Sequence, residues 1–306
     1  MNKNAITVIM LTLNEEYHLP GAIENVKGWA EEIFIVDSCS TDSTVDIALA
    51  HGVNIVQRPF TNFGDQWNFA LDKLPIKTPW TLKLDPDERL SPELKEEICK
   101  LVAGSPECCG YSMDRRLWFM GRALHVSNEV LRLWRTGKCR FSDVIVNEHP
   151  LIDGKVGKIK GILEHYDSQD LHHWLEKQNS YTTMEAIMRV RGDKLAVQPR
   201  LFGSPLERRM YLKKIFFLIP FRYRLQWLYE AFVRGAIRDG PIGLAWVHLR
   251  VEVMRTVELK ANEIRISGRI PPIPANPKNE YDPRVLTSPL QKLVTGHANV
   301  ESRSHE

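Results

Sequence analysis

The chain has no hydrophobic run that approaches the roughly 18 uncharged apolar residues a membrane-spanning helix needs. Its five cysteines form neither a Cys-x-x-Cys pair nor a zinc-ligand spacing, so we expect a cytoplasmic protein with reduced thiols. The formal net charge of +3 is too small to indicate nucleic-acid binding, and no nucleic-acid-binding motif is present. With 306 residues, 43% of them hydrophobic, the chain is still long enough for one large core and an appendage.

Missing motifs also exclude several enzyme classes. No Gly-x-Gly-x-x-Gly follows the first expected strand, which excludes a nicotinamide dehydrogenase. No glycine-rich, basic phosphate loop occurs early in the chain, which argues against a nucleotidyltransferase. A phosphatase with an Asp nucleophile would carry its Asp-x-Asp pair after the first strand, whereas here the pair follows the fourth.

Short β-branched, apolar runs alternate with helical patterns through the first hundred residues. The expected strands cover residues 5–11, 33–36, 53–56 and 80–84. The expected helices cover residues 19–26, 45–50 and 65–74, and a fourth begins after the capping sequence Ser91-Pro92-Glu93. Strands that alternate with helices of about ten residues predict βαβ units and a mainly parallel sheet.

Two carboxylates separated by one residue, Asp85 and Asp87, follow the fourth expected strand. Open α/β sheets bind their ligands at the carboxyl ends of the strands. Carboxylate oxygens suit Mg²⁺ or Mn²⁺, and Mg²⁺ is usually held by one or two carboxylates together with substrate phosphates. Asn14 and Glu15 follow the first strand and Asp37 follows the second, so these side chains are expected at the same edge. The pattern predicts a site for a nucleoside diphosphate and a metal ion.

Three segments, in this order, resemble the signature segments of family 2 glycosyltransferases. They are Thr12-Leu13-Asn14-Glu15-Glu16, Val36-Asp37-Ser38 with Ser40-Thr41-Asp42-Ser43-Thr44, and Leu84-Asp85-Pro86-Asp87-Glu88. Later segments resemble the subgroup related to lipopolysaccharide-core β-1,4-glucosyltransferases. These are Gly121-Arg122-Ala123-Leu124-His125, Leu131-Arg132-Leu133-Trp134, Val146-Asn147-Glu148, His165-Tyr166, Asp239-Gly240 and Gly243.

The resemblance implies a GT-A fold, which is a Rossmann-like, mainly parallel sheet flanked by helices. It further implies a nucleotide-sugar donor such as a UDP-hexose, a Mg²⁺ or Mn²⁺ ion, and inversion at the anomeric carbon. The implied acceptor is a cell-surface glycan or a lipid-linked molecule such as lipopolysaccharide core. The residues implied in nucleotide binding are Thr12, Asn14, Glu15, Asp37 and Asp85. Asp87 would contact the metal and act in catalysis, with Asp85 and His165 as further ligands.

An inverting transfer also needs a base for the acceptor hydroxyl, which we expect in the later half of the chain. Glu148 aligns with a family Glu that usually follows a His, although this chain has Asn147 there. Asp143 is the nearby rival, and a structural role for Glu148 stays open.

Four other side chains keep two interpretations each. His165 is either a metal or phosphate ligand or a hydrogen-bonded structural histidine, and Arg132 pairs with a phosphate or with a core carboxylate. Trp118 and Trp134 either stack on a sugar or fill the core. The Gln-x-x-Arg-Trp motif of processive synthases is absent, which favours an enzyme that adds a single sugar.

Residues 200–265 differ in composition from the rest of the chain. They carry a net charge of +7, from 13 basic and 6 acidic residues, interleaved with large aromatics. Basic and aromatic side chains at helical spacing are typical of a helix that lies in a lipid headgroup region. We therefore expect peripheral attachment to the inner face of the cell membrane. An ordinary helical subdomain and a subunit interface in a homo-oligomer are the alternatives.

These patterns predict a glycosyltransferase domain over residues 1–199, with a nucleotide-sugar half (about 1–105) and an acceptor half (about 106–199). A basic helical extension over 200–265 and a Pro-rich, poorly ordered tail over 266–306 complete the expected chain. The competing function is a non-catalytic module that binds nucleotide sugars at a membrane surface.

Overall fold

The computed structural model describes residues 4–142, 149–192, 198–203, 205–271 and 280–295. Its first part alternates strands and helices as the sequence predicts, with boundaries shifted by a few residues. The elements are β1 (Asn4–Thr12), α1 (Leu19–Val26), β2 (Ala30–Asp37), α2 (Thr44–Ala50), β3 (Asn54–Gln57), α3 (Phe63–Lys73), β4 (Trp80–Lys83), β5 (Glu88–Leu90) and α4 (Pro92–Ala103). Caps fix two of these helices, because Asn62 accepts from the backbone of α3 and Ser91 from that of α4.

The second part consists of longer strands followed by helices. Its strands are β6 (Gly110–Phe119), β7 (Arg122–Arg135), β8 (Cys139–Phe141), β9 (Pro150–Ile152) and β10 (Val156–His165). Its helical elements are α5 (Leu171–Arg191), α6 (Pro205–Ile215), η1 (Phe216–Leu218), α7 (Arg222–Leu228), η2 (Tyr229–Val233), η3 (Ala236–Asp239), α8 (Gly240–Ser267), α9 (Pro283–Leu286) and α10 (Pro289–Thr295).

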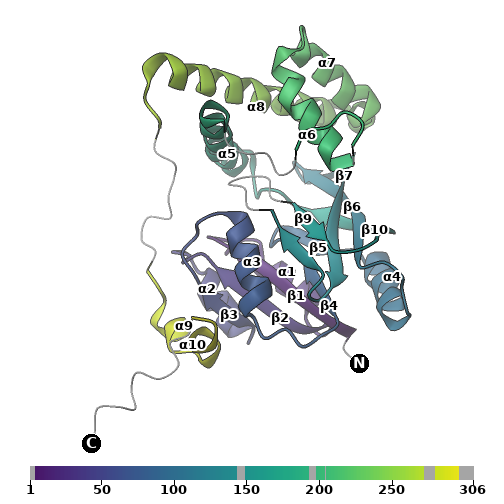
Figure 1. The fold of residues 1–306 in the computed structure, drawn as a ribbon, viewed down its shortest axis with the longest axis vertical. Coiled ribbons are helices and arrows are strands. Elements are labelled where there is room, and N and C mark those ends of the chain that lie inside the picture. The colour runs from purple at the N-terminus through teal and green to yellow at the C-terminus, as the bar shows by residue number, and fades with distance from the viewer. Residues whose placement is uncertain (1–3, 143–148, 193–197, 204, 272–279, 296–306) are drawn as a thin grey trace, which may run out of the picture.

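Eight strands form one sheet in the order β3-β2-β1-β4-β7-β6-β10-β5 (Figure 1). β1, β2, β3 and β4 pair in parallel, whereas β7 runs antiparallel to both β4 and β6. β10 is parallel to β6, and β5 returns antiparallel beside β10. The acidic loop between β4 and β5 therefore lies next to the carboxyl end of β10. This arrangement confirms the expected α/β class.

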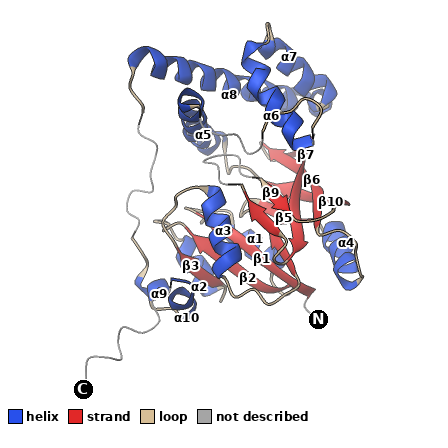
Figure 2. Ribbon diagram, in the orientation of Figure 1, coloured by secondary structure: helices blue, strands red, loops and turns tan. Residues whose placement is uncertain are grey.

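Successive side chains of β1 point to opposite faces of the sheet, so the core has two layers. Ile6, Val8 and Met10 pack with α1, α2 and α4 on one face of the sheet. Ile9 packs with Trp67 of α3 on the other face. Helices therefore cover both faces of the sheet (Figure 2), as a buried parallel sheet requires.

The helical elements from α6 to α8 form a layer beyond the end of the sheet (Figure 1). Trp246 of α8 packs against Phe119 of β6 and Trp174 of α5, which joins this layer to the strands. Among the described residues, no helix combines the length and the apolar character needed to cross a membrane.

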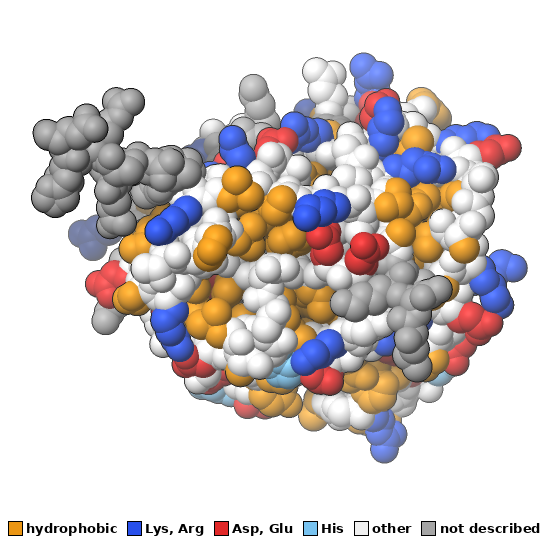
Figure 3. Space-filling model, turned by 90° about the horizontal axis from the view of Figure 1, so that it is seen from below, with side chains coloured by type: hydrophobic (Ala, Val, Ile, Leu, Met, Phe, Trp, Pro, Cys, Tyr) orange, Lys and Arg blue, Asp and Glu red, His pale blue; other side chains and the backbone are white. Residues whose placement is uncertain are grey.

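The tail differs from the expectation, because residues 280–295 fold back onto the edge strand β3. Val285 of α9 joins the core on one face of the sheet, and Val294 of α10 joins the core on the other. Gln291 accepts from the backbone N–H of Gln57 at 2.7 Å and donates to its carbonyl at 2.9 Å. The expected poorly ordered tail is therefore wrong for this stretch, which covers an edge that would otherwise be open. Seen from below, this end of the molecule carries hydrophobic side chains among charged groups of both signs (Figure 3).

Candidate functional site

The carboxyl ends of β1 and β2 meet at Thr12 and Asp37, which are partners in the parallel register. The Thr12 hydroxyl donates to Asp37 Oδ1 at 2.8 Å, and Gln57 Nε2 donates to Asp37 Oδ2 at 2.8 Å. The backbone N–H of Ser40 donates to the same Oδ2 at 2.9 Å. Asp37 is fully buried, so its carboxylate organises the two loops that follow. Its predicted contact with a nucleotide stays a prediction.

The loops after β1 and β2 are tied together by hydrogen bonds. Asn14 Oδ1 accepts from the N–H of Thr41 at 2.8 Å, and the N–H of Asn14 donates to the Ser40 hydroxyl at 2.9 Å. The N–H of Glu15 donates to the Thr44 hydroxyl at 2.8 Å. Asn14 adopts a left-handed backbone conformation, with φ of 56°, which Asn tolerates better than most residues. The two loops consequently form one rim along the carboxyl edge of the sheet.

The acidic loop between β4 and β5 forms ion pairs with Arg132 and Lys83. Arg132 Nη2 contacts Asp85 Oδ2 at 2.8 Å and Glu88 Oε1 at 2.7 Å, and Glu88 is fully buried. Lys83 Nζ lies 3.5 Å from Asp85 Oδ1. Burial alone raises the pKa of Asp85, but Lys83 and Arg132 outweigh it and hold that pKa below its ordinary value. Of the two interpretations of Arg132, the structure shows the pairing with carboxylates.

Asp87, His165 and Asp167 bring three metal-ligating side chains together, with ligand atoms within 4.8 Å of one another. His165 Nε2 lies 3.3 Å from Asp87 Oδ2 and 3.8 Å from Asp167 Oδ1. The N–H of Tyr166 donates to the carbonyl of Asp87 at 2.7 Å, which fixes the end of β10 against the acidic loop. Asp85 is not part of this cluster, because Arg132 and Lys83 hold its carboxylate elsewhere.

Lys177 of α5 places its ammonium group inside this cluster. Its Nζ lies 3.4 Å from Asp87 Oδ2 and 3.1 Å from Asp167 Oδ1, and it also donates to the Asp167 carbonyl at 3.0 Å. Burial raises the pKa of Asp87, but His165 and Lys177 outweigh it and hold that pKa well below its ordinary range. A buried Oδ1 of Asp87 has no hydrogen-bond partner in the described part of the chain. A cation position with an unused carboxylate oxygen fits a divalent metal ion.

Glu15 faces the same cluster from the rim. Burial, together with the negative charge of Asp87, raises the pKa of Glu15 to about 8, despite the opposing charge of Lys177. The carboxyl group therefore carries a proton at neutral pH while no metal is bound.

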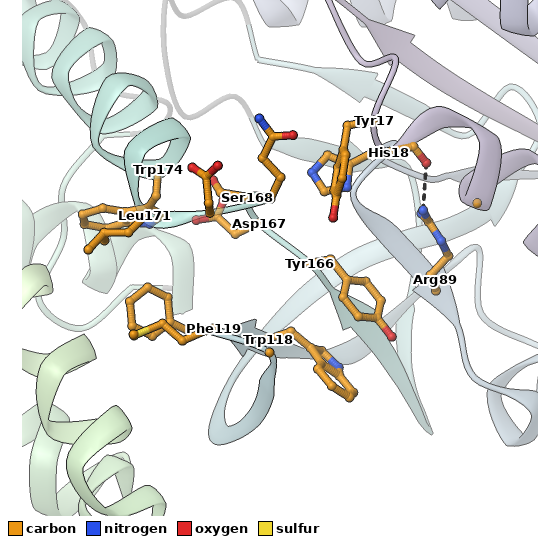
Figure 4. Close-up of a pocket in the computed structure, with 15 residues that line it drawn as sticks. Tyr17, His18, Arg89, Trp118, Phe119, Tyr166, Asp167, Ser168, Leu171 and Trp174 are labelled. Carbon is orange, nitrogen blue, oxygen red and sulfur yellow. Dashed lines mark hydrogen bonds between the residues drawn. The ribbon is translucent and has the colours of Figure 1, made fainter.

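A pocket of about 510 Å³ opens beside the cluster. Figure 4 shows Tyr17 and His18 on one side, Trp118 and Tyr166 below them, and Trp174 at the far end. Asp167 lines this pocket and belongs to the metal-type cluster as well. The site therefore has a rim of nucleotide-type loops, a cation position and an adjoining cavity.

The structure brings together most of the predicted site residues. Thr12, Asn14, Glu15 and Asp37 lie on the rim, and Asp87 and His165 lie in the cluster. Trp134 is fully buried in the core, whereas Trp118 lines the pocket. Glu148 and Asp143 lie outside the described residues.

Sequence reasoning missed Asp167 and Lys177. Asp167 had a usable signal, because His165-x-Asp167 at the end of a strand repeats the spacing of Asp85-x-Asp87. Lys177 had none, since it meets Asp87 across 90 residues of sequence.

Comparisons with known proteins give a consistent family. The model of the family described as Glycosyl transferase family 2 matches residues 7–148. The lipopolysaccharide core biosynthesis glycosyltransferase LpsC of Rhizobium meliloti is 30% identical over 226 residues, which cover 70% of this chain and 82% of that protein. An uncharacterized glycosyltransferase of Rickettsia typhi is 29% identical over 196 residues, covering 59% and 66%. Among solved structures, the mannosyltransferase PcManGT of Pyrobaculum calidifontis, in complex with GDP-Man and Mn²⁺, matches with a TM-score of 0.48 and 13% identity, covering 88% and 89%.

The raised pKa of Glu15 predicts a pH-dependent stability that Glu15→Gln removes. Between pH 4.5 and about 8 the folded protein holds a proton that the unfolded chain has released, so its free energy of unfolding falls as the pH rises. The Gln variant cannot ionise, so its melting temperature in EDTA should exceed that of the original protein increasingly from about pH 5 to about pH 9. Thermal unfolding across that range measures this, with the exposed Glu31→Gln as the control. Identical pH profiles for Glu15→Gln and the original protein would contradict it.

Proposed function

Because the chain belongs to glycosyl transferase family 2 and is a glycosyltransferase, we propose that it moves a hexose from a UDP-sugar to a cell-surface glycan or lipid-linked acceptor such as lipopolysaccharide core. The cluster of Asp87, His165 and Asp167 beside the two nucleotide-type loops carries this proposal. The acceptor class rests on the printed name of the relative from Rhizobium meliloti.

The donor would lie along the rim with its diphosphate at the cluster. Asp87, His165 and Asp167 would hold a Mg²⁺ or Mn²⁺ ion, which supplies charge neutralisation for the leaving diphosphate. The nucleoside would contact the rim residues Thr12, Asn14, Glu15 and Asp37. Asp85, whose carboxylate Arg132 and Lys83 hold outside the cluster, would face the ribose. Lys177, already within 3.4 Å of Asp87, adds a second positive charge at the position of the diphosphate.

Inversion requires one in-line displacement, with a base that takes the proton of the acceptor hydroxyl. Glu148 remains our proposal for this base, with Asp143 as the rival.

Asp87→Asn tests the donor site. The variant should lose Mn²⁺-dependent binding of UDP-sugars and reduce donor turnover by orders of magnitude, because charge neutralisation at the diphosphate is lost. Calorimetry with UDP-glucose and Mn²⁺ measures the binding, and radiolabelled UDP-glucose measures the hydrolysis. The control is Asp153→Asn, which neutralises a solvent-exposed acid outside the site. An Asp87→Asn protein that still binds UDP-glucose with unchanged Mn²⁺ dependence would sink this assignment.

Glu148→Gln tests the base. The substitution keeps the shape of the side chain and removes its basicity, so transfer should collapse while UDP-sugar affinity changes little. Rate and affinity are measured in parallel for Glu148→Gln and Asp143→Asn. If Asp143→Asn is the inactive variant and Glu148→Gln transfers normally, the base is Asp143.

We further propose that the enzyme works at the inner face of the cell membrane, attached through residues 200–265. Phe221, Leu225, Leu228 and Phe232 lie in or next to α7 and η2, and all four are exposed; Leu225 and Leu228, three residues apart, share one face of α7. Phe221 is 73% exposed, and the exposed Arg224 lies beside it, with its guanidinium carbon 5.9 Å from the ring centroid. Trp227 packs against His248 instead, with ring centroids 5.9 Å apart. Exposed apolar groups with neighbouring cations suit an anionic lipid surface.

A double variant, Phe221→Ser with Leu225→Ser, should sediment several-fold less with anionic liposomes than the original chain, because apolar insertion is lost. Leu293→Ser is the matched control, since Leu293 is 61% exposed on α10, at the other end of the molecule (Figure 1). Salt should weaken only the electrostatic share of the binding. If the double variant binds as well as the control, or no protein binds, residues 200–265 serve packing or assembly instead.

A further inference from the structure

The pocket beside the cluster has an aromatic wall. Trp118 and Tyr166 stack with ring centroids 5.1 Å apart and an interplanar angle of 26°. The Trp118 indole N–H donates to Glu164 at 2.7 Å, and Arg116 donates to the same carboxylate at 3.0 Å, so the indole is held in place. Tyr17 is 63% exposed and extends toward Tyr166 from the opposite side (Figure 4). These rings border a space wide enough for a small cyclic ligand.

Polar groups without partners line the same pocket. His18 is 5% exposed, and its Nε2 has no hydrogen-bond partner among the described residues. The same holds for Trp174 Nε1, which is also buried, and for the Ser168 hydroxyl. Burial lowers the pKa of His18 to about 4, so the ring is neutral at pH 7 and offers one donor and one acceptor. Buried polar atoms of this kind gain most from a ligand that carries hydroxyl groups.

The charges on the wall favour an uncharged ligand. Arg89 is the one lysine or arginine among the lining residues, and its guanidinium already donates to the carbonyls of Pro86, Glu88 and His18. Asp170 accepts from the backbone N–H of His173 as the cap of α5, and Asp167 pairs with Lys177. The lining thus has two carboxylates and one cation, and this excess of negative charge disfavours an anionic ligand.

The position of the pocket links it to the reaction. His165 and Asp167 belong to the metal-type cluster, while Tyr166 between them joins the aromatic wall. A ligand in contact with Tyr166 is therefore next to His165 and Asp167, which are proposed to hold the metal ion of the diphosphate.

We propose that this pocket is the acceptor subsite, which takes an uncharged pyranose ring packed against the aromatic wall of Trp118 and Tyr166, with its hydroxyls on His18 and Trp174. The assignment of this pocket to the acceptor rests on the proposed function. The binding of a sugar ring in the pocket can be measured separately from donor binding.

The test uses saturation-transfer NMR with the full chain and three uncharged probes: methyl β-D-glucopyranoside, methyl α-D-mannopyranoside and methyl β-D-galactopyranoside. At least one should bind, and Trp118→Leu and Tyr166→Leu should each weaken it about fivefold to tenfold, the size expected for losing one stacked aromatic surface. Trp118→Phe, which restores a flat ring, should recover part of the binding. Tyr229→Leu, which removes an exposed aromatic ring outside the pocket, should bind as the original protein does.

Thermal shift with UDP-glucose and Mn²⁺ reports folding and donor binding for every variant, and both should be retained. The proposal is overturned if no uncharged probe binds the original chain. It is also overturned if both Leu variants bind unchanged, or if methyl β-D-glucopyranosiduronate binds better than the neutral glucoside. If the glycosides bind but no nucleotide sugar does, the sugar pocket stands and the proposed donor chemistry falls.

Discussion

The site depends on neutralising carboxylates that the fold crowds at one edge of the sheet. Glu15, Asp85, Asp87, Glu88 and Asp167 face this region, and isolated buried carboxylates are unfavourable. Each is neutralised in its own way. Arg132 pairs with Asp85 and Glu88, Lys177 lies between Asp87 and Asp167, and Glu15 keeps its proton. The ion pairs of Arg132 with Asp85 and Glu88 fix the loop. At Asp87 the cation is Lys177, which has a long, flexible side chain.

This difference separates a structural half of the acidic motif from a ligand-binding half. Arg132 is 7% exposed on a central strand and donates to two carboxylates, so removing it would leave buried charges unpaired. Lys177 is a long, flexible side chain on α5 that reaches Asp87 and Asp167 from outside the loop. The same loop thus combines two carboxylates fixed by Arg132 with a third, Asp87, whose Oδ1 has no hydrogen-bond partner among the described residues.

The local parts of this architecture could be predicted from the sequence, because they depend on neighbours along the chain. Strand patterns, caps such as Ser91 and the acidic pair after β4 all lie within short windows. The cation in the cluster could not be predicted, since Lys177 reaches Asp87 across 90 residues. The prediction for the tail was wrong for the same reason. Its Pro-rich, polar composition indicates disorder, yet Gln291 hydrogen-bonds to Gln57 across 234 residues. Contacts of that length depend on the finished sheet, which composition does not reveal.

Gln57 shows how such a distant contact reaches the site. Its side chain donates to Asp37 and accepts from the N–H of Asp282, while its backbone pairs with Gln291. The folded tail therefore fixes the residue that holds Asp37, and Asp37 in turn orders the loops of the rim. At the opposite side, Trp246 of α8 packs under Phe119, which lines the aromatic pocket. The tail (residues 280–295) and α8 thus each pack against residues that hold or line a part of the site. Under the proposed function, the tail supports the donor half of the site and α8 supports the acceptor half, and transfer requires these two halves to meet in line.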